Sequence, residues 1–115
     1  MKFKMNNHEW EILELPKEQI KLIYEKEMNE ETLYVYGLTK YDNHKIYINK
    51  ELCFDMKRKT LMHELMHCYL YSFISFNNID FSIDDFCDIS ANSHDIIHKI
   101  VEDYFKGDKK WKQRY

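Results

Sequence analysis

The pentapeptide His63-Glu64-Leu65-Met66-His67 constrains this 115-residue chain more than any other feature. Residues four apart on a helix lie on one face, so the imidazoles of His63 and His67 can reach one metal ion. Glu64 is rotated by about 100° from His63, close enough to hold a water molecule on the open side of that ion. Two imidazole ligands, a carboxylate base and a position left for water form the layout of a zinc hydrolase.

The residues around this HExxH motif argue against a chance match, which is expected in roughly 3% of chains of this composition. The chance alternative is a pair of surface histidines on a solvated helix. Apolar residues instead cover most of the helix circumference, which predicts a core helix: Leu61, Met62, Leu65, Met66, Tyr69, Leu70 and Phe73. The remaining arc carries Thr60, His63, Glu64, His67 and Tyr71. A charged Glu and two His on a core helix are costly unless a metal compensates them.

Size and composition predict one folded domain over residues 1–115, with a solvated tail from about 107 to 115. The chain is 44% hydrophobic and 16% aromatic, as globular domains are. The net charge of −3 means that the chain lacks the excess positive charge that attracts nucleic acid, so we expect no nucleic-acid partner. The N-terminus lacks an apolar signal core and no run reaches membrane-spanning length, so we expect a cytoplasmic protein without a membrane partner.

Three cysteines, Cys53, Cys68 and Cys87, are an odd number without paired spacing, which suits reduced thiols. Cys68 directly follows His67 and points about 100° away from the metal face. We therefore expect Cys68 to pack in the core and not to bind metal.

Hydrophobic periodicity predicts a small α+β domain of order β-α-β-β-α-α, in which a short sheet is backed by the motif helix and the final helix packs alongside. The expected elements are an extended segment from about Phe3 to Leu15, a helix beginning at Pro16, a hairpin over Thr32–Asn49 that turns at Asp42-Asn43-His44, the motif helix from an Asp55 N-cap to about Ser75, and a last helix from Ser82 to Gly107. Its inner stripe is expected to be Ile83, Phe86, Cys87, Ser90, Ile97 and Val101.

Two histidines alone hold zinc poorly, so a third protein ligand is expected from elsewhere in the fold. The last helix offers Asp84, Asp85 and Asp88. Asp84 and Asp88 share a face, so one can bind the metal while the other accepts the N–H of a metal-bound His. We favour Asp84 as the ligand, with Asp88 or Asp85 as the alternatives. Acids at a helix start also favour the positive end of the macrodipole, and Ser82 with Asp85 suits a capping box.

The motif helix, followed by Asp84-x-x-x-Asp88, resembles the gluzincin metallopeptidases, whose HExxH precedes an ExxxD on a second helix. More narrowly, three segments resemble the short zincin-like proteins of phages and mobile elements, relatives of the ImmA/IrrE and SprT-like groups: Asn43–Asn49, His63–His67 and Phe81–Asp88. The likeness covers about residues 33 to 105. Asp84 stands where the family has Glu, which shortens its reach to the metal by roughly 1.5 Å.

The resemblance implies a minimal zincin-like fold and a zinc metallo-endopeptidase with one Zn²⁺ per chain, acting on a peptide or protein substrate. His63, His67 and Asp84 hold the ion, and Glu64 is the general base. An oxyanion donor is expected among four candidates, which are His94, His98, Tyr104 and Tyr36. The substrate is expected to add to the sheet edge supplied by the Thr32–Asn49 hairpin.

Two other classes of function compete with this interpretation. The site can be a zinc staple of a small domain, although a structural site needs no base such as Glu64 and usually has four protein ligands. The chain can also be a zinc-binding regulatory or interaction module of a mobile element without peptidase activity. The sequence does not determine the oligomeric state, and we favour a monomer.

Overall fold

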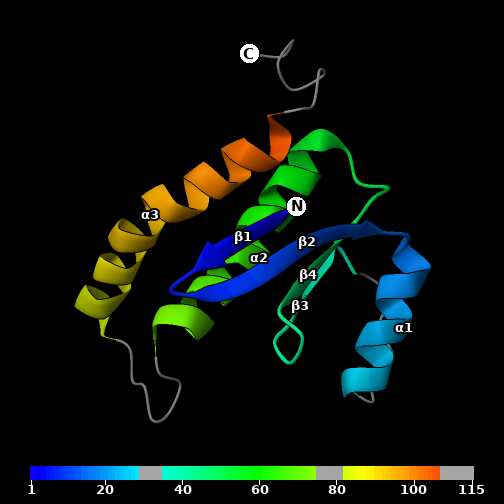
Figure 1. Cartoon of the computed structure of the whole chain (residues 1–115), viewed down its shortest axis with the longest axis horizontal. Coiled ribbons are helices and arrows are strands. Elements are labelled where there is room, and N and C mark those ends of the chain that lie inside the picture. Colours follow the sequence, from blue (N-terminus) through cyan, green and yellow to red (C-terminus); the bar gives the residue numbers. More distant parts are fainter. Residues whose placement is uncertain (29–34, 75–81, 107–115) are drawn as a thin grey trace.

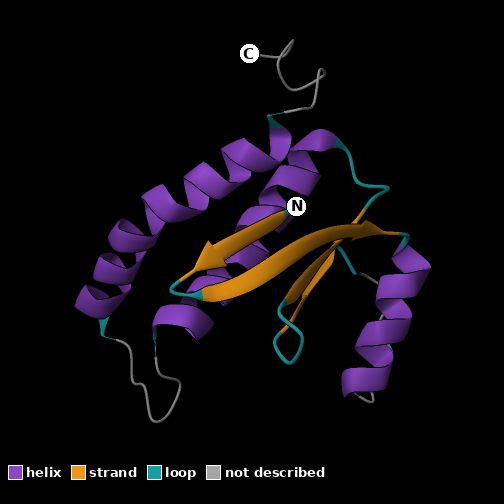
Figure 2. Ribbon diagram, in the orientation of Figure 1, coloured by secondary structure: helices purple, strands orange, loops and turns teal. Residues whose placement is uncertain are grey.

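A computed structural model describes residues 1–28, 35–74 and 82–106 of the chain. The elements are β1 (Lys2–Met5), β2 (His8–Leu15), α1 (Lys17–Met28), β3 (Gly37–Lys40), β4 (Lys45–Asn49), α2 (Phe54–Phe73) and α3 (Ile83–Phe105). One sheet separates α1 from α2 and α3 (Figures 1 and 2). This arrangement confirms the α+β class, and the narrower zincin-like architecture stays a prediction. The predicted tail over residues 107–115 lies outside the described residues.

The four strands form a mixed sheet in the order β1-β2-β4-β3. The pairs β1–β2 and β3–β4 are antiparallel, and β2 runs parallel to β4 with Ile12 opposite Ile46. The predicted hairpin around Asp42-Asn43-His44 is therefore confirmed over residues 37–49, while residues 32–34 lie outside the described part. Because β3 is last in the strand order, it lies at one edge of the sheet.

The opening segment is two strands and not one, so the predicted order β-α-β-β-α-α was wrong at its start. Asn6 and Asn7 both have left-handed backbone conformations, with φ of 48° and 67°. Two left-handed residues suit the tight turn of a hairpin, and Asn adopts this conformation more readily than other non-glycine residues. The Asn-Asn pair was the signal that should have divided Phe3–Leu15 into β1 and β2.

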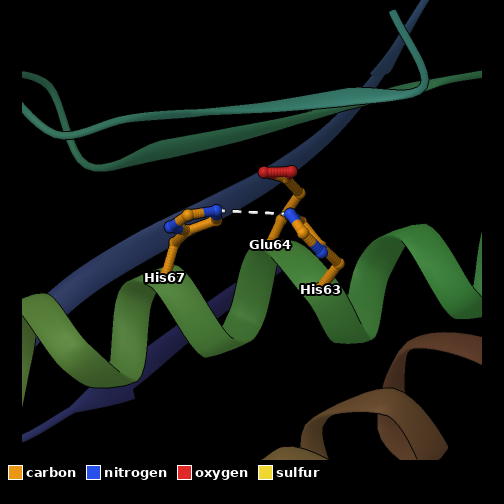
Figure 3. Close-up of side chains that lie close together, drawn as sticks. All are labelled: His63, Glu64 and His67. Atoms are coloured by element: carbon orange, nitrogen blue, oxygen red, sulfur yellow. Dashed lines mark hydrogen bonds between the residues drawn. The ribbon is translucent and has the colours of Figure 1, made fainter. Parts of the chain in front are cut away.

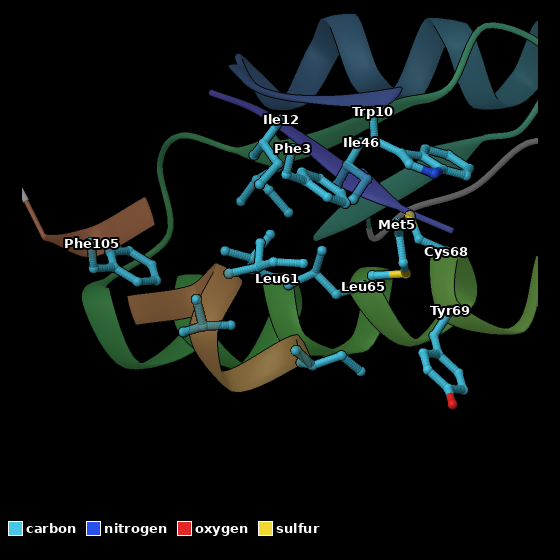
Figure 4. Close-up of a cluster of buried hydrophobic side chains, with 14 residues drawn as sticks. Phe3, Met5, Trp10, Ile12, Ile46, Leu61, Leu65, Cys68, Tyr69 and Phe105 are labelled. Carbon is cyan, nitrogen blue, oxygen red and sulfur yellow. The ribbon is translucent and has the colours of Figure 1, made fainter. Parts of the chain in front are cut away.

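Successive side chains of a strand point to opposite faces of the sheet, and this divides the core into two layers. In β4, Ile46 and Ile48 face the layer shared with α2 and α3, while Tyr47 faces α1. The larger cluster is shown in Figure 4 and consists of Phe3, Met5, Trp10, Ile12, Ile46, Ile48, Leu61, Leu65, Cys68, Tyr69, Ile97, Ile100, Val101 and Phe105. Of its members from α2, Leu61, Leu65 and Cys68 turn toward the sheet, whereas Tyr69 points away from it. Helix α2 packs directly against β3 and β4.

Helix α2 begins and ends within two residues of the predicted bounds. Its N-cap is Cys53, which makes no side-chain capping hydrogen bond, so the prediction of Asp55 as N-cap was wrong. Asp55 lies in the first turn, where a carboxylate favours the positive end of the macrodipole. The predicted end at Ser75 lies outside the described residues. Although α2 and α3 have 20 and 23 residues, neither they nor any other helix in the described ranges is apolar enough to cross a membrane.

Helix α3 starts as predicted, but only the second half of the residues expected on its inner face is buried. Ser82 and Asp85 form the capping box, with Asp85 N donating to Ser82 Oγ over 3.1 Å. Ile97 and Val101 are buried, but Ile83 is 83% exposed and Phe86 is 66% exposed. Cys87 and Ser90 are exposed as well, so the first half of the predicted stripe was wrong. The physical reason is position, because the first turns of α3 stand away from the sheet (Figure 1).

Candidate functional site

Helix α2 brings the three polar residues of the motif into one group. The Nε2 atoms of His63 and His67 lie 3.3 Å apart, and one donor atom from each of His63, Glu64 and His67 lies within 4.8 Å of the others. Figure 3 shows the two rings turned toward each other and the Glu64 carboxylate beside them, on the side of α2 that faces the sheet. This geometry follows from the helix itself, because positions four apart lie above one another on one face.

The separation of the two imidazole nitrogens matches the spacing that one small cation imposes. Two zinc–nitrogen bonds of about 2.0–2.1 Å at a tetrahedral angle put the nitrogens about 3.3 Å apart. The pKa of His67 is lowered by burial and by the neighbouring His63, which favours the neutral imidazole that a metal requires. The donor set therefore suits a divalent cation, and in the absence of a metal one ring can donate a hydrogen bond to the other.

Glu64 is a buried carboxylate held next to the two histidines. Its side chain is only 6% exposed. The hydroxyl of Thr39 on β3 lies 3.3 Å from Glu64 Oε1 and 3.3 Å from the Glu64 carbonyl oxygen, and it can donate to either. Burial raises the pKa of Glu64, opposed by His63 and by the Thr39 hydrogen bond. A carboxylate with a raised pKa suits proton transfer near neutral pH better than an ordinary solvated one.

At Gly37, strand β3 approaches α2 more closely than a side chain at that position would allow. A Cβ atom on Gly37 would lie 2.7 Å from Thr60 Cγ2, 3.0 Å from the Tyr47 carbonyl oxygen and 3.2 Å from Glu64 Cγ. Gly37 thus sets how near the edge strand comes to Glu64. The sequence did not point to Thr39 or Gly37, because their role depends on which strand packs on α2.

The face of α2 that carries His63 and His67 has different neighbours at its two ends. Beyond His67, the ring of Tyr71 contacts a cluster of aromatic rings from the sheet side, including Trp10 at 5.7 Å and His44 at 5.7 Å between centroids. At the other end, next to His63 and Glu64, a pocket of about 470 Å³ opens between the start of α2, the residues at the beginning of β3 and α1. Small-molecule and substrate pockets commonly have volumes of roughly 300–1,000 Å³.

The structure does not bring the acidic residues of α3 to the histidines. Asp84, Asp85 and Asp88 are exposed, and none of them belongs to the group formed by the motif. The predicted assignment of Asp84 as third ligand, with Asp88 or Asp85 as alternatives, therefore finds no support in the arrangement of the described residues. Asp85 instead accepts a hydrogen bond from the Ser82 backbone over 3.2 Å.

The packing of the two helices explains this separation. Helix α3 contacts α2 through its C-terminal half, where Ile97, Ile100 and Val101 join the cluster that contains Leu61. Leu61 is two positions before His63, so their side chains point about 200° apart around the helix. In Figure 3 the ribbon of α3 accordingly lies on the other side of α2 from the two rings.

Of the four candidate oxyanion donors, one lies at the site. Tyr36 lines the pocket together with His63 and Glu64. The other three have partners elsewhere: His98 pairs with Glu102, the ring of His94 lies beside that of His98, and the Tyr104 hydroxyl donates to Glu14.

A residue that the sequence did not indicate, Tyr41, lies within electrostatic reach of the site. Burial raises its pKa, and Cys68 and Glu64 raise it further. Cys68 itself is fully buried in the main hydrophobic cluster, as predicted.

Comparisons of the chain with known protein families, with curated proteins and with solved structures found no match.

Proposed function

We propose that the chain is a zinc-dependent peptidase whose reaction centre is formed by His63, Glu64 and His67. The observation that carries this proposal is the 3.3 Å separation of the two Nε2 atoms with the Glu64 carboxylate beside them. His63 and His67 hold the ion through neutral imidazoles. The structure supplies no third protein ligand from α3, whose acidic residues lie outside the group formed by the motif.

The residues of the chain divide the chemistry among them. Zinc, when bound, lowers the pKa of a water molecule and polarises the carbonyl group of a peptide bond. Glu64 takes the proton of the attacking water and passes it to the leaving amine. Thr39 orients the Glu64 carboxylate from β3, and the burial of Glu64 tunes its basicity. Tyr36, which lines the pocket beside Glu64, and Tyr41, whose pKa Glu64 helps to raise, are the candidates for donating to developing negative charge.

Two further features support a peptide as the substrate. Strand β3 is an edge strand that packs against the motif helix, and an extended peptide can pair with such an edge through backbone hydrogen bonds. A pocket next to His63 and Glu64 can receive a side chain of a peptide held there. The interaction-module alternative is supported by the exposed apolar side chains of Ile83 and Phe86 at the start of α3.

The decisive experiment replaces Glu64 with Gln. The two side chains have nearly the same size, so the protein should keep its fold and about one zinc per chain. Loss of the general base should reduce hydrolysis of a mixed peptide library by about 10²–10⁴-fold. Activity and zinc content are measured on the same samples, and Glu18→Gln on the exposed face of α1 serves as the matched control.

Each outcome of this experiment has a definite meaning. Loss of activity in Glu64→Gln but not in Glu18→Gln supports the peptidase. Equal activity in Glu64→Gln and the parent protein would show that another group or a contaminant cleaves the peptides. Zinc bound without hydrolysis in any variant contradicts a broadly acting peptidase and favours the interaction module.

A further inference from the structure

The pocket beside Glu64 carries two kinds of surface. Its apolar wall comes from three parts of the fold: Tyr24 of α1, Leu38 of β3 with Val35 just before that strand, and Met56 of α2. Lys59 lines the same pocket, one helical turn before His63. Glu64 lines the pocket as well, so an apolar wall adjoins two groups of opposite charge. In such a site burial supplies affinity and the charged groups set the orientation of the ligand.

Lys59 differs from its two basic neighbours on α2 in having no side-chain partner among the described residues. Lys57 pairs with Glu14 over 2.7 Å, and Arg58 lies 3.5 Å from the sulfur of Met62. Lys59 makes no ion pair with any residue of the described ranges. Its ammonium group is therefore available to an anionic ligand in the pocket.

The positions of Lys59 and Glu64 restrict where that anion can lie. The two residues are five apart, which is about 7.5 Å along the helix axis. A ligand carboxylate is repelled by Glu64 and attracted by Lys59, so it belongs at the Lys59 end. The two positions also differ by about 140° around the helix, and their axial separation of about 7.5 Å corresponds to roughly two residues of extended chain.

We propose that this pocket selects a large apolar or aromatic residue of the substrate that has a carboxylate within two residues of the cleaved bond, with Lys59 pairing to that carboxylate. The carboxylate is either the free C-terminus of a peptide or the side chain of an adjacent Asp or Glu. That this ligand is a substrate rests on the proposed peptidase function, whereas its binding to the pocket does not.

Binding of small probes to the metal-free protein tests this proposal without any catalysis. In excess chelator, N-acetylphenylalanine, its amide and N-acetylglycine are titrated while chemical shifts of the protein are followed. Burial of the phenyl ring should make N-acetylphenylalanine bind about 10- to 100-fold more tightly than N-acetylglycine. The charge of Lys59 should add roughly a two- to fivefold preference for the acid over the amide.

Variants assign each preference to its residue. Lys59→Gln should abolish the preference for the acid and keep the preference for the phenyl ring. The matched control Lys4→Gln, exposed on the opposite edge strand β1, should keep both. Met56 belongs to neither core cluster, so Met56→Trp should fill the pocket and weaken both phenylalanine probes. If Met56→Trp fails to fold, Met56→Ala should instead shift the preference toward N-acetyltryptophan.

The source of the carboxylate is distinguished by a further probe, acetyl-Phe-Asp-amide. Tighter binding of N-acetylphenylalanine identifies the C-terminal residue of a peptide, and tighter binding of acetyl-Phe-Asp-amide identifies an internal acidic residue. An acid preference that is absent, or that survives in Lys59→Gln, overturns the proposal. Because no bond is cleaved, this result is independent of the outcome for Glu64→Gln.

Discussion

Helix α2 carries His63 and His67, and helix α3 carries Asp84 and Asp88, each pair at four-residue spacing. Among the described residues, only the pair on α2 belongs to a group that could hold a metal ion. His63 and His67 converge because one helix sets their separation. Asp84 and Asp88 share a face of α3, but that face is exposed and lies in the first turns, away from the body of the domain. The comparison shows that spacing within a helix determines which side chains share a face, while packing determines what that face meets.

Zinc binding by variants of the two helices is the strongest test of this difference between α2 and α3. His63→Ala and His67→Ala should each abolish stoichiometric zinc, because the remaining imidazole cannot hold the ion alone. Asp84→Ala, Asp85→Ala and Asp88→Ala should leave zinc affinity within a few fold of the parent value. Elemental analysis and zinc titration of the five variants measure this.

A large loss of affinity in one of the aspartate variants would contradict the placement of α3. Loss in Asp84→Ala alone would mean that the first turns of α3 move onto the histidine face when metal binds. Retention of zinc in both histidine variants would remove the site altogether.

The contact between β3 and α2 gives the next largest expected effect. Gly37→Ala places a Cβ atom 2.7 Å from Thr60 Cγ2 and 3.0 Å from the backbone oxygen of Tyr47. Such overpacking should cost about 1–3 kcal/mol of the free energy of unfolding. Urea denaturation of the metal-free protein, in excess chelator, measures this cost. A neutral Gly37→Ala would show that β3 does not approach α2 this closely.

A smaller effect is expected at the start of α3, where Ser82 and Asp85 form a capping box. Ser82→Ala removes the side-chain acceptor for the Asp85 backbone N–H and should cost about 1 kcal/mol. Zinc affinity should stay unchanged, because this part of α3 makes no contact with the histidine group in the structure. Thermal denaturation and zinc titration on the same variant separate the two quantities. A coupled loss of stability and zinc would tie the α3 start to the metal site.

The smallest expected effect concerns the burial of Glu64 and has a definite sign. Because burial raises the pKa of Glu64 in the folded state, the unfolded chain ionises first as pH rises. The stability associated with this group is complete below its unfolded pKa and is lost as pH rises through the folded pKa. In excess chelator, Glu64→Gln should therefore be more stable than the parent at pH 8, with the gain vanishing toward pH 4.

Denaturation midpoints of the two proteins across this pH range provide the measurement. A parent protein that is equally stable or more stable at pH 8 would contradict the raised pKa. A gain in stability on removing Glu64, together with a loss of activity in the same variant, is expected where a buried charge is retained for function.

Local sequence determined much of this protein. Helical spacing predicted the His63–His67 pair, strand alternation predicted the β3–β4 hairpin, and Ser82 with Asp85 predicted the start of α3. Each of these depends on residues a few positions apart, whose geometry is set by the backbone of one element. The missed β1–β2 turn at Asn6 and Asn7 was also local, and its signal was present in the sequence.

Tertiary structure decided the rest. The exposed half of α3, the Thr39 hydroxyl at Glu64, the close approach of Gly37 and the pocket beside Lys59 all depend on how elements far apart in the chain pack together. Periodicity shows that a helix has an apolar face but does not show how far along the helix a partner extends. For this reason the sequence could identify the two imidazoles and the carboxylate, while their surroundings were set by the packing of β3 and α3 against α2 and of α1 against the other face of the sheet.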